Sequence, residues 1–232
     1  MENSSKPVAL ITGANKGLGL EIARQLGQQD IAVVLGARQH KAEAAAAELR
    51  AQGLDARAIT LDVTSTADIA ALPAFFQATF GRLDILVNNA GVQLDDGLAT
   101  TPDALRQTYE ANVIGPYAIT QALLPLLRQA PAGRIVNQSS ILGSLATISA
   151  GHGGSWTTPG YTSSKAALNM LTVVLAQQLA DTAIKVNAAH PGWVKTDLGG
   201  PDALLDVREG ARTAVRLALL PADGPTGGFF HN

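Results

Sequence analysis

The stretch that decides the fold is Thr12-Gly13-Ala14-Asn15-Lys16-Gly17-Leu18-Gly19. It joins the apolar run Val8–Thr12, which predicts a buried strand, to the amphipathic segment Leu18–Gln28, which predicts a helix. Glycines at such a junction allow a tight turn and let a phosphate approach backbone N–H groups at the positive end of the helix dipole. The spacing G-x-x-x-G-x-G differs from the G-x-G-x-x-G of longer dinucleotide-binding domains, and close helix–strand packing also requires glycine. The turn alone is therefore weak evidence, but its place at the first strand of an alternating chain favours a nucleotide site.

Strands and helices are predicted to alternate along the whole chain. Most strand candidates are continuous apolar runs, which is typical of a parallel sheet covered on both faces. We therefore predict an α/β fold, a single-domain doubly wound parallel sheet over residues 1–232, with residues 1–6 as a disordered tail. The stretch 143–160 is expected to be a long loop, and 227–230 a last short strand. The other predicted strands are Ala32–Gly36, Ala56–Leu61, Ile85–Asn88, Arg134–Asn137 and Ile184–Ala188, and the other predicted helices include His40–Ala51, Ala67–Phe80 and Ala166–Ala180.

The composition narrows the classes of function. The 232 residues include no cysteine, which excludes disulfides and thiolate chemistry, and four scattered histidines give no support for a metal site. The net charge is −2, without a basic block that would indicate nucleic-acid binding, and no apolar run is long enough to span a membrane. The expected protein is soluble and cytoplasmic, with a small-molecule partner.

The end of the second predicted strand bears on the choice of dinucleotide. NAD-binding proteins usually place a carboxylate there to bind the ribose 2′-hydroxyl. Here the strand ends in Leu35-Gly36-Ala37-Arg38, with no acid. Arg38 could make a forked contact with a 2′-phosphate, and Lys16 could add a second positive charge. The sequence therefore predicts NADP(H) as the cofactor, although both cations could instead be solvated surface residues.

A tyrosine and a lysine share one helical face further along the chain. Tyr161 and Lys165 are four residues apart, and the preceding Pro159-Gly160 is a helix start signal. A nearby ammonium stabilises a phenolate, so Lys165 is expected to lower the pKa of Tyr161 and prepare it to donate a proton to a carbonyl oxygen. Such a pair is common on helix surfaces, so it carries weight only together with its neighbours in the sequence.

The motifs occur in a specific order. The glycine turn is followed by Asn88-Asn89-Ala90-Gly91 after the fourth strand, Ser139-Ser140 after the fifth, and then the Tyr161/Lys165 pair. In this set the chain resembles the short-chain dehydrogenase/reductase family, from about Pro7 to Phe230. The glycine turn and the stretch His190-Pro191-Gly192-Trp193-Val194-Lys195-Thr196-Asp197 are most similar to the NADPH-dependent carbonyl reductases of that family. The resemblance implies a Rossmann fold and hydride transfer between NADP(H) and a carbonyl or alcohol.

The resemblance also implies a role for each matching residue. Ser140 would hold the substrate carbonyl oxygen, Tyr161 would act as general acid/base, and Lys165 would bind the nicotinamide ribose and lower the tyrosine pKa. Asn112 matches the asparagine whose backbone holds a water leading to the lysine, and Trp193 matches a tryptophan of the substrate pocket, with simple packing as the alternative. The implied cofactor-binding residues are Gly13, Asn15, Lys16, Gly17, Leu18, Gly19, Arg38, Asp62, Val63, Asn89, Ala90, Gly91, Tyr161, Lys165, Pro191, Gly192, Val194 and Thr196.

One departure from the family pattern leaves the assembly open. Ser140 and Tyr161 are 21 positions apart, several more than is usual in the family, and the extra residues include His152 and Trp156. A homo-oligomer (dimer or tetramer) and a monomer are both compatible with an insertion of this size, which could also narrow the substrate mouth.

The alternatives that remain use the same site. A 3-oxoacyl-thioester reductase and a steroid or alcohol dehydrogenase would need the same Ser140, Tyr161 and Lys165. A non-catalytic NADP-sensing regulator would be expected to have lost the tyrosine or the lysine, and both are present. The substrate, its stereochemistry and the physiological direction are not decided by the sequence.

Overall fold

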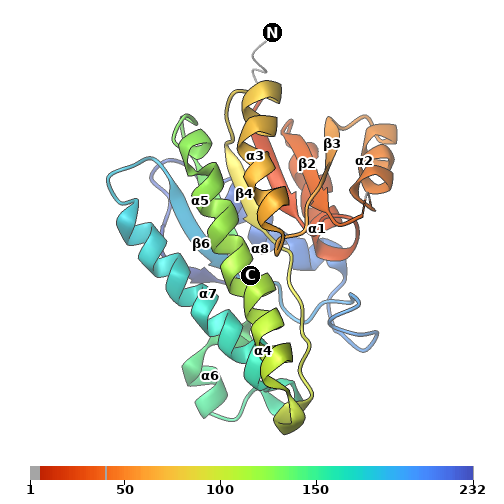
Figure 1. Cartoon of the computed structure of the whole chain (residues 1–232), viewed down its shortest axis with the longest axis vertical. Coiled ribbons are helices and arrows are strands. Elements are labelled where there is room, and N and C mark those ends of the chain that lie inside the picture. Colours follow the sequence, from red (N-terminus) through yellow and green to blue (C-terminus); the bar gives the residue numbers. More distant parts are fainter. Residues whose placement is uncertain (1–5, 40, 232) are drawn as a thin grey trace.

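Seven parallel strands form one sheet in the order β3-β2-β1-β4-β5-β6-β7 (Figure 1). The computed structural model describes residues 6–39 and 41–231. In register, Leu10 of β1 lies beside Val34 of β2 on one side and Leu86 of β4 on the other. The strands are β1 Val8–Thr12, β2 Ala32–Ala37, β3 Ala56–Thr60, β4 Ile85–Asn88, β5 Arg134–Gln138, β6 Lys185–Ala189 and β7 Phe229–Phe230.

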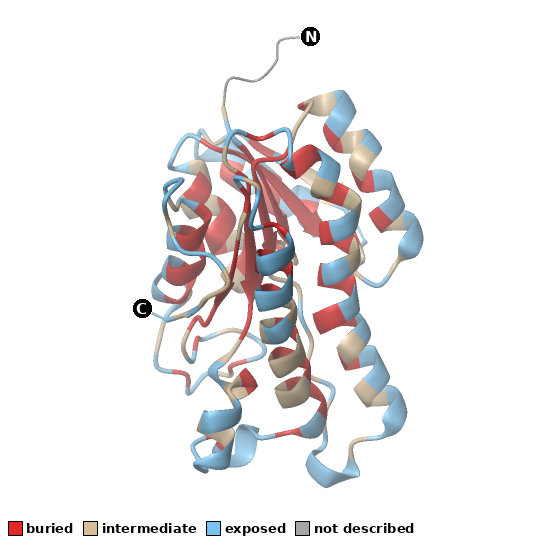
Figure 2. Cartoon of the chain, turned by 90° about the vertical axis from the view of Figure 1, so that its left-hand side faces the viewer, coloured by how far each residue is buried: buried red, intermediate tan, exposed pale blue. Residues whose placement is uncertain are grey.

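Helices cover both faces of this sheet. α3, α5 and α7 lie on one face, in front of the sheet in Figure 1, and α1, α2 and α8 lie on the other. The long helices expose one side and bury the other, while most strand residues are buried (Figure 2). The helices are α1 Gly17–Gly27, α2 Lys41–Ala51, α3 Thr66–Thr79, α4 Pro102–Tyr109, α5 Gly115–Leu127, α6 Leu145–Ser149, α7 Pro159–Gln178 and α8 Val207–Ala218.

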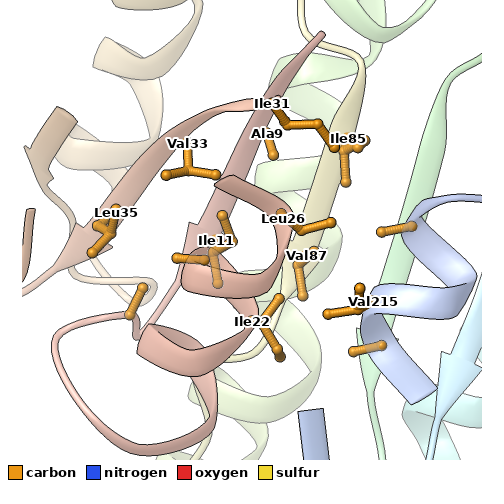
Figure 3. Packing of buried hydrophobic residues seen from close by; sticks show 14 of the residues in the cluster. Ala9, Ile11, Ile22, Leu26, Ile31, Val33, Leu35, Ile85, Val87 and Val215 are labelled. Carbon is orange, nitrogen blue, oxygen red and sulfur yellow. The ribbon is translucent and has the colours of Figure 1, made fainter. Parts of the chain in front are cut away.

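Each helical layer packs its own apolar core against the sheet. Beneath α1 and α8, Ile22, Leu26 and Val215 meet Ile11 and Val87 of the central strands (Figure 3). On the opposite face, a separate cluster includes Phe76 of α3, Ile119 of α5 and Leu175 of α7. Because both faces are buried, the strands read as continuous apolar runs, and this is why their positions are predictable from the sequence.

The strand order places the site. β1 is flanked by β2 on one side and β4 on the other, so the chain reverses its direction of winding between β1 and β4. In doubly wound sheets, ligands bind in the crevice outside the carboxyl ends of the strands at this switch point. The glycine turn follows β1 at that edge, and the segment that begins with Asn89 follows β4.

The predicted doubly wound sheet is confirmed, with differences at two places. The stretch 143–160 is no simple loop, because it contains α6 and a short 3-10 turn, Gly154–Trp156, and α7 already begins at Pro159. Lys6 pairs with Asp30 at 2.5 Å, and its carbonyl accepts a hydrogen bond from Arg82, so it belongs to the folded body. The rest of the predicted tail, residues 1–5, and the predicted helix start at His40 lie outside the described residues. Within the described ranges, no helix combines the length and the apolar character needed to cross a membrane.

Candidate active site

A cavity of about 940 Å³ opens at the carboxyl edge of the central strands. Its volume is at the upper end of the range for ligand pockets. It is bordered by the glycine turn, the ends of β2 and β3, the segment after β4, the start of α7 and the segment after β6. Of the predicted cofactor and catalytic residues, the ones that border it are Gly13, Asn15, Lys16, Gly17, Leu18, Gly19, Arg38, Asp62, Val63, Asn89, Ala90, Gly91, Tyr161, Lys165, Pro191 and Thr196.

The glycines of the turn are required by close backbone packing. Gly13 has φ +66°, and a Cβ there would lie 2.9 Å from Ala90 Cα. A Cβ on Gly19 would lie 2.6 Å from Asn89 Nδ2, whose amide donates a hydrogen bond to Thr12 O. The turn and the segment after β4 therefore fit against each other only without these side chains, and together they form the floor of the cavity.

The N-terminus of α1 is open toward an anion. Its N-cap residue, Lys16, makes no side-chain capping hydrogen bond, so its side chain leaves the first-turn N–H groups uncapped. Such N–H groups, with the helix dipole behind them, form a ready site for phosphate. The turn and helix thus fit the pyrophosphate of a dinucleotide.

Arg38 and Asp62 border the same cavity from the ends of the neighbouring strands β2 and β3. Arg38 is exposed, and strand β2 ends at Ala37 without a carboxylate. Asp62 Oδ1 accepts hydrogen bonds from the backbone N–H and the hydroxyl of Thr64, at 2.9 and 2.8 Å. These bonds, with a smaller contribution from Arg38, hold the pKa of Asp62 below its usual value. Asp62 therefore forms a strand-end turn and also borders the cavity.

Tyr161 and Lys165 are both buried in the first turns of α7. The Lys165 ammonium lies 5.5 Å from the centre of the Tyr161 ring and donates a hydrogen bond to Gln138 O at 2.8 Å. Burial raises the pKa of Tyr161 to about 12, with a hydrogen bond to the Ser140 side chain acting in the opposite direction. Burial also lowers the pKa of Lys165 to about 8. The sequence predicts a lowered tyrosine pKa, and in this structure that prediction is wrong, because desolvation outweighs the other contributions.

The two serines after β5 take different roles. Ser139 borders the cavity, but its hydroxyl donates a hydrogen bond to Asn169 Oδ1 at 2.6 Å. The Ser140 side chain acts to lower the pKa of Tyr161, and its Oγ accepts a hydrogen bond from Leu142 N–H at 3.2 Å. Ser140 itself does not border the cavity, so its predicted contact with a substrate oxygen stays a prediction, whereas Ser139 joins the turn to α7.

Asn112 lies in a π-helical turn, Glu110–Ile114, between α4 and α5. Its amide side chain is fully buried and pairs with both backbone groups of Val92, accepting from N–H and donating to O, each at 2.8 Å. It also donates to Ser164 Oγ at 3.0 Å. Asn112 thus holds the segment after β4 against α7 beside Lys165, and π turns of this kind are frequent at functional sites.

The segment after β6 meets the cavity only in part. Pro191 and Thr196 border it, whereas the predicted contacts Gly192 and Val194 do not. Val194 is buried, and a Cβ on Gly210 of α8 would lie only 2.5 Å from its side chain, so Val194 packs tightly against that helix. Gly192 has φ +82° and serves the turn itself.

Lys16 and Asp197 form an ion pair between the glycine turn and the segment after β6. Both side chains are largely exposed, and the hydrogen bond from Lys16 lowers the pKa of Asp197. Lys16 was predicted from the sequence only as a contact for a 2′-phosphate. In this structure its ammonium is shared with a carboxylate, so Arg38 is the better placed of the two cations.

Trp193 contacts the insertion before α7. Its ring lies 6.0 Å from that of Trp156 in an edge-to-face arrangement, and its Nε1–H donates to Gly199 O at 2.7 Å. It does not border the cavity itself, so the packing alternative describes what is seen, and a substrate contact stays a prediction.

His190 joins the segment after β5 to the segment after β6. Its Nδ1 accepts hydrogen bonds from Ile141 N–H at 3.2 Å and Gly192 N–H at 3.4 Å. Its ring lies 4.5 Å from that of His231. Burial, together with His231, lowers the pKa of His190 to about 4. The imidazole is therefore neutral at pH 7, as both accepted bonds require.

Protonation of His190 should make the stability of the fold depend on pH. Its folded pKa is about 4 and that of the unfolded chain is near 6.5, so between these values the unfolded chain binds more protons and stability rises with pH. Lowering the pH from 7 to 4.5 should cost about 1–3 kcal/mol through His190. The drop in urea-unfolding free energy should shrink in His190→Asn, which keeps an acceptor, and persist in the exposed-loop control His152→Asn. If the free energy of unfolding fell equally in His190→Asn and the wild type, His190 would not be the source of this pH dependence.

Several lining residues carry no recognisable pattern in the sequence. Gln138 ends β5 beside Ser139, and both polar atoms of its buried side chain lack a partner among the described residues. The predicted strand ends one residue earlier, at Asn137, so the sequence assigns Gln138 no role. The other lining residues that the sequence analysis does not single out as binding residues include Leu94, Gln107, Glu110, Lys195, Asp197 and Leu198.

Comparison with known proteins decides the family. The family model for short chain dehydrogenase matches residues 7–203. The chain belongs to the short-chain dehydrogenase family. The chain is 35% identical to carbonyl reductase [NADPH] 1 of Mus musculus, over 98% of its own length and 96% of that protein. It is 39% identical to the short-chain dehydrogenase anuI of Penicillium roqueforti, over 92% and 89%.

Solved structures of short-chain dehydrogenases share the fold. An actinorhodin polyketide ketoreductase crystallised with NADPH superposes with a TM-score of 0.85 at 29% identity, over 99% of this chain and 96% of the other. The predicted family is therefore confirmed, and so is the predicted similarity to carbonyl reductases. The roles of single residues of this short-chain dehydrogenase stay predictions.

Proposed function

We propose that this short-chain dehydrogenase reduces aldehydes or ketones to alcohols with NADPH. The observation that carries the proposal is a single cavity that brings Tyr161 and Lys165 together with an open helix N-terminus and Arg38. The glycine turn packs closely against the segment after β4 beside this helix N-terminus, and the Gln138 amide, which lacks a partner among the described residues, offers further polar groups. These residues fit a dinucleotide. When bound, the cofactor would supply a hydride to the carbonyl carbon.

The protein's own groups would handle the carbonyl oxygen. With a pKa of about 12, Tyr161 carries its proton at pH 7 and can donate it as negative charge develops on that oxygen. Ser140, the second serine after β5, would donate a second hydrogen bond to the same oxygen. In the reverse direction the same group would accept the proton of the alcohol.

The preference for NADP(H) over NAD(H) rests on Arg38. A guanidinium can bind a 2′-phosphate with two parallel hydrogen bonds, and β2 supplies no carboxylate that would repel it. The mouse relative is named for NADPH, and the polyketide ketoreductase was crystallised with it, which supports the same choice here.

One alternative has a specific observation in its favour. The similarity to a polyketide ketoreductase supports reduction of 3-oxoacyl thioesters at the same site. A steroid or alcohol dehydrogenase would use the same residues in the oxidative direction, with Tyr161 accepting the proton. An NADP-sensing regulator would not require the buried pair of Tyr161 and Lys165.

A substrate screen tests the proposal. NADPH consumption should be followed at 340 nm with aldehydes, ketones, quinones, oxo-esters and 3-oxoacyl thioesters, with NADH in parallel. We expect turnover of simple carbonyl compounds with NADPH and much slower turnover with NADH. Turnover of thioesters alone would favour the alternative. Tight NADPH binding without consumption in any reaction would contradict a reductase and favour the sensor.

A further inference from the structure

A carboxylate from the segment after β4 binds the start of the helix that carries Tyr161. Asp95 Oδ1 accepts a hydrogen bond from Gly160 N–H at 2.5 Å, and Asp95 Oδ2 accepts one from Tyr161 N–H at 2.7 Å. Asp95 lies 66 positions before Tyr161 in the chain and is half-buried. No sequence motif points to it.

The helix has no cap of its own. The N-cap residue of α7, Thr158, makes no side-chain capping bond, and Pro159 at the first helical position has no N–H to donate. The first N–H groups of α7 are therefore those of Gly160 and Tyr161, and both bind Asp95. A carboxylate at a helix N-terminus also interacts favourably with the helix dipole.

Gly160 is fitted to this carboxylate. A Cβ at position 160 would lie 2.5 Å from Asp95 Oδ1, closer than any real contact. Gly160 does not have a positive φ, so its backbone conformation alone does not require glycine. A side chain at this position would instead have to displace the Asp95 carboxylate.

The segment that carries Asp95 is itself tied to the site. Val92 pairs with the buried Asn112 amide through both of its backbone groups, and Gly91 and Leu94 border the cavity. Asp95 therefore joins one wall of the cavity to the backbone N–H of the residue that bears the reactive hydroxyl.

We propose that Asp95 is a positioning residue that holds Tyr161 in place for proton donation. This rests on the role proposed for Tyr161. Asp95 does not touch the cavity's reactive groups; it fixes the backbone from which the tyrosine side chain projects. A displacement of about 1 Å at such a position can cost roughly 10²-fold in rate. A cap that served stability alone would lower the melting temperature and leave kcat per folded molecule unchanged.

Removing the carboxylate tests the proposal against that simpler role. Asp95→Ala should lower kcat by about 10–10²-fold, while the NADPH dissociation constant changes by less than about threefold. Asp95→Asn keeps one acceptor oxygen, so its kcat should lie between those of Asp95→Ala and the wild type. Asp96→Ala, which removes the neighbouring exposed carboxylate, is the matched control and should behave like the wild type. Equal kcat values for Asp95→Ala, Asp96→Ala and the wild type would overturn the proposal.

A double-variant cycle tests the contact itself. Gly160→Ala should lower kcat because its Cβ displaces the Asp95 carboxylate, and it should have little further effect once that carboxylate is gone in Asp95→Ala. Strictly multiplicative effects of the two substitutions on kcat would count against the contact. Should Asp95→Ala not fold, Asp95→Asn combined with Gly160→Ala completes the same cycle.

Hydrogen exchange gives a readout without turnover. In the cofactor-free protein, Asp95→Ala should speed amide exchange at Gly160 and Tyr161 and leave the end of α7 near Gln178 unchanged. Unchanged exchange at both amides would refute the bonds on which the proposal depends. Since the wild type is assayed first, failure to reduce any carbonyl would show that the proposed function is wrong, whereas a fully active Asp95→Ala would show that only the positioning role is wrong.

Discussion

Replacing Tyr161 with phenylalanine is expected to lower kcat for carbonyl reduction by about 10²–10⁴-fold. The substitution removes only the hydroxyl, and the ring, which is 8% exposed, keeps its packing. The lost group is the one whose proton, with a pKa of about 12, is retained at pH 7 for the developing alkoxide. Steady-state NADPH consumption with a carbonyl substrate of the wild type measures the loss.

The controls for this variant separate chemistry from binding. Tyr117→Phe removes the same atom from a half-exposed tyrosine on α5, and it should keep normal turnover. NADPH binding, followed by quenching of protein fluorescence, should be preserved in Tyr161→Phe. Turnover of Tyr161→Phe within a few-fold of the wild type would show that another group supplies the proton.

Replacing Arg38 with aspartate should reverse the cofactor preference. The change removes the cation proposed to bind the 2′-phosphate and adds a carboxylate that repels it but can accept a hydrogen bond from a ribose 2′-hydroxyl. A hydrogen bond to a charged group contributes about 1.5–3 kcal/mol, and the proposed forked contact has two. The ratio of kcat/KM for NADPH to that for NADH should therefore fall by at least about 10²-fold.

Arg208→Asp is the matched control for the change in charge. Arg208 is exposed in the first turn of α8 and does not border the cavity, so the same substitution there should leave the cofactor ratio unchanged. If Arg38→Asp changed kcat/KM equally for NADPH and for NADH, the proposed 2′-phosphate contact would be refuted. They would leave Arg38 as an ordinary surface cation.

The sheet and the outline of the cavity could be predicted because their signals are local. Strands buried on both faces read as apolar runs, and the glycine turn marks the end of β1 and the start of α1. Arg38 and Tyr161 lie next to such recognisable ends, so their position at one edge of the sheet follows from the parallel strand order.

Other features of the site could not be predicted, because they depend on contacts between segments that are distant in the sequence. The bond from Tyr161 N–H to Asp95 spans 66 positions, and a single carboxylate in a loop carries no pattern. The π turn around Asn112 depends on a side chain that pairs with Val92, on another segment. The direction in which the Tyr161 pKa shifts depends on burial. The four-residue spacing of Tyr161 and Lys165 does not reveal how deeply they are buried.

The central claim is that this chain moves a hydride from NADPH to a carbonyl carbon with Tyr161 as proton donor. The most direct measurement uses NADPH deuterated at the transferable C4 position with a ketone substrate and mass spectrometry of the product. The account predicts an alcohol with one deuterium on the former carbonyl carbon, formed by the wild type and almost absent with Tyr161→Phe. Alcohol formed without deuterium, or equal labelled product from Tyr161→Phe, would contradict it.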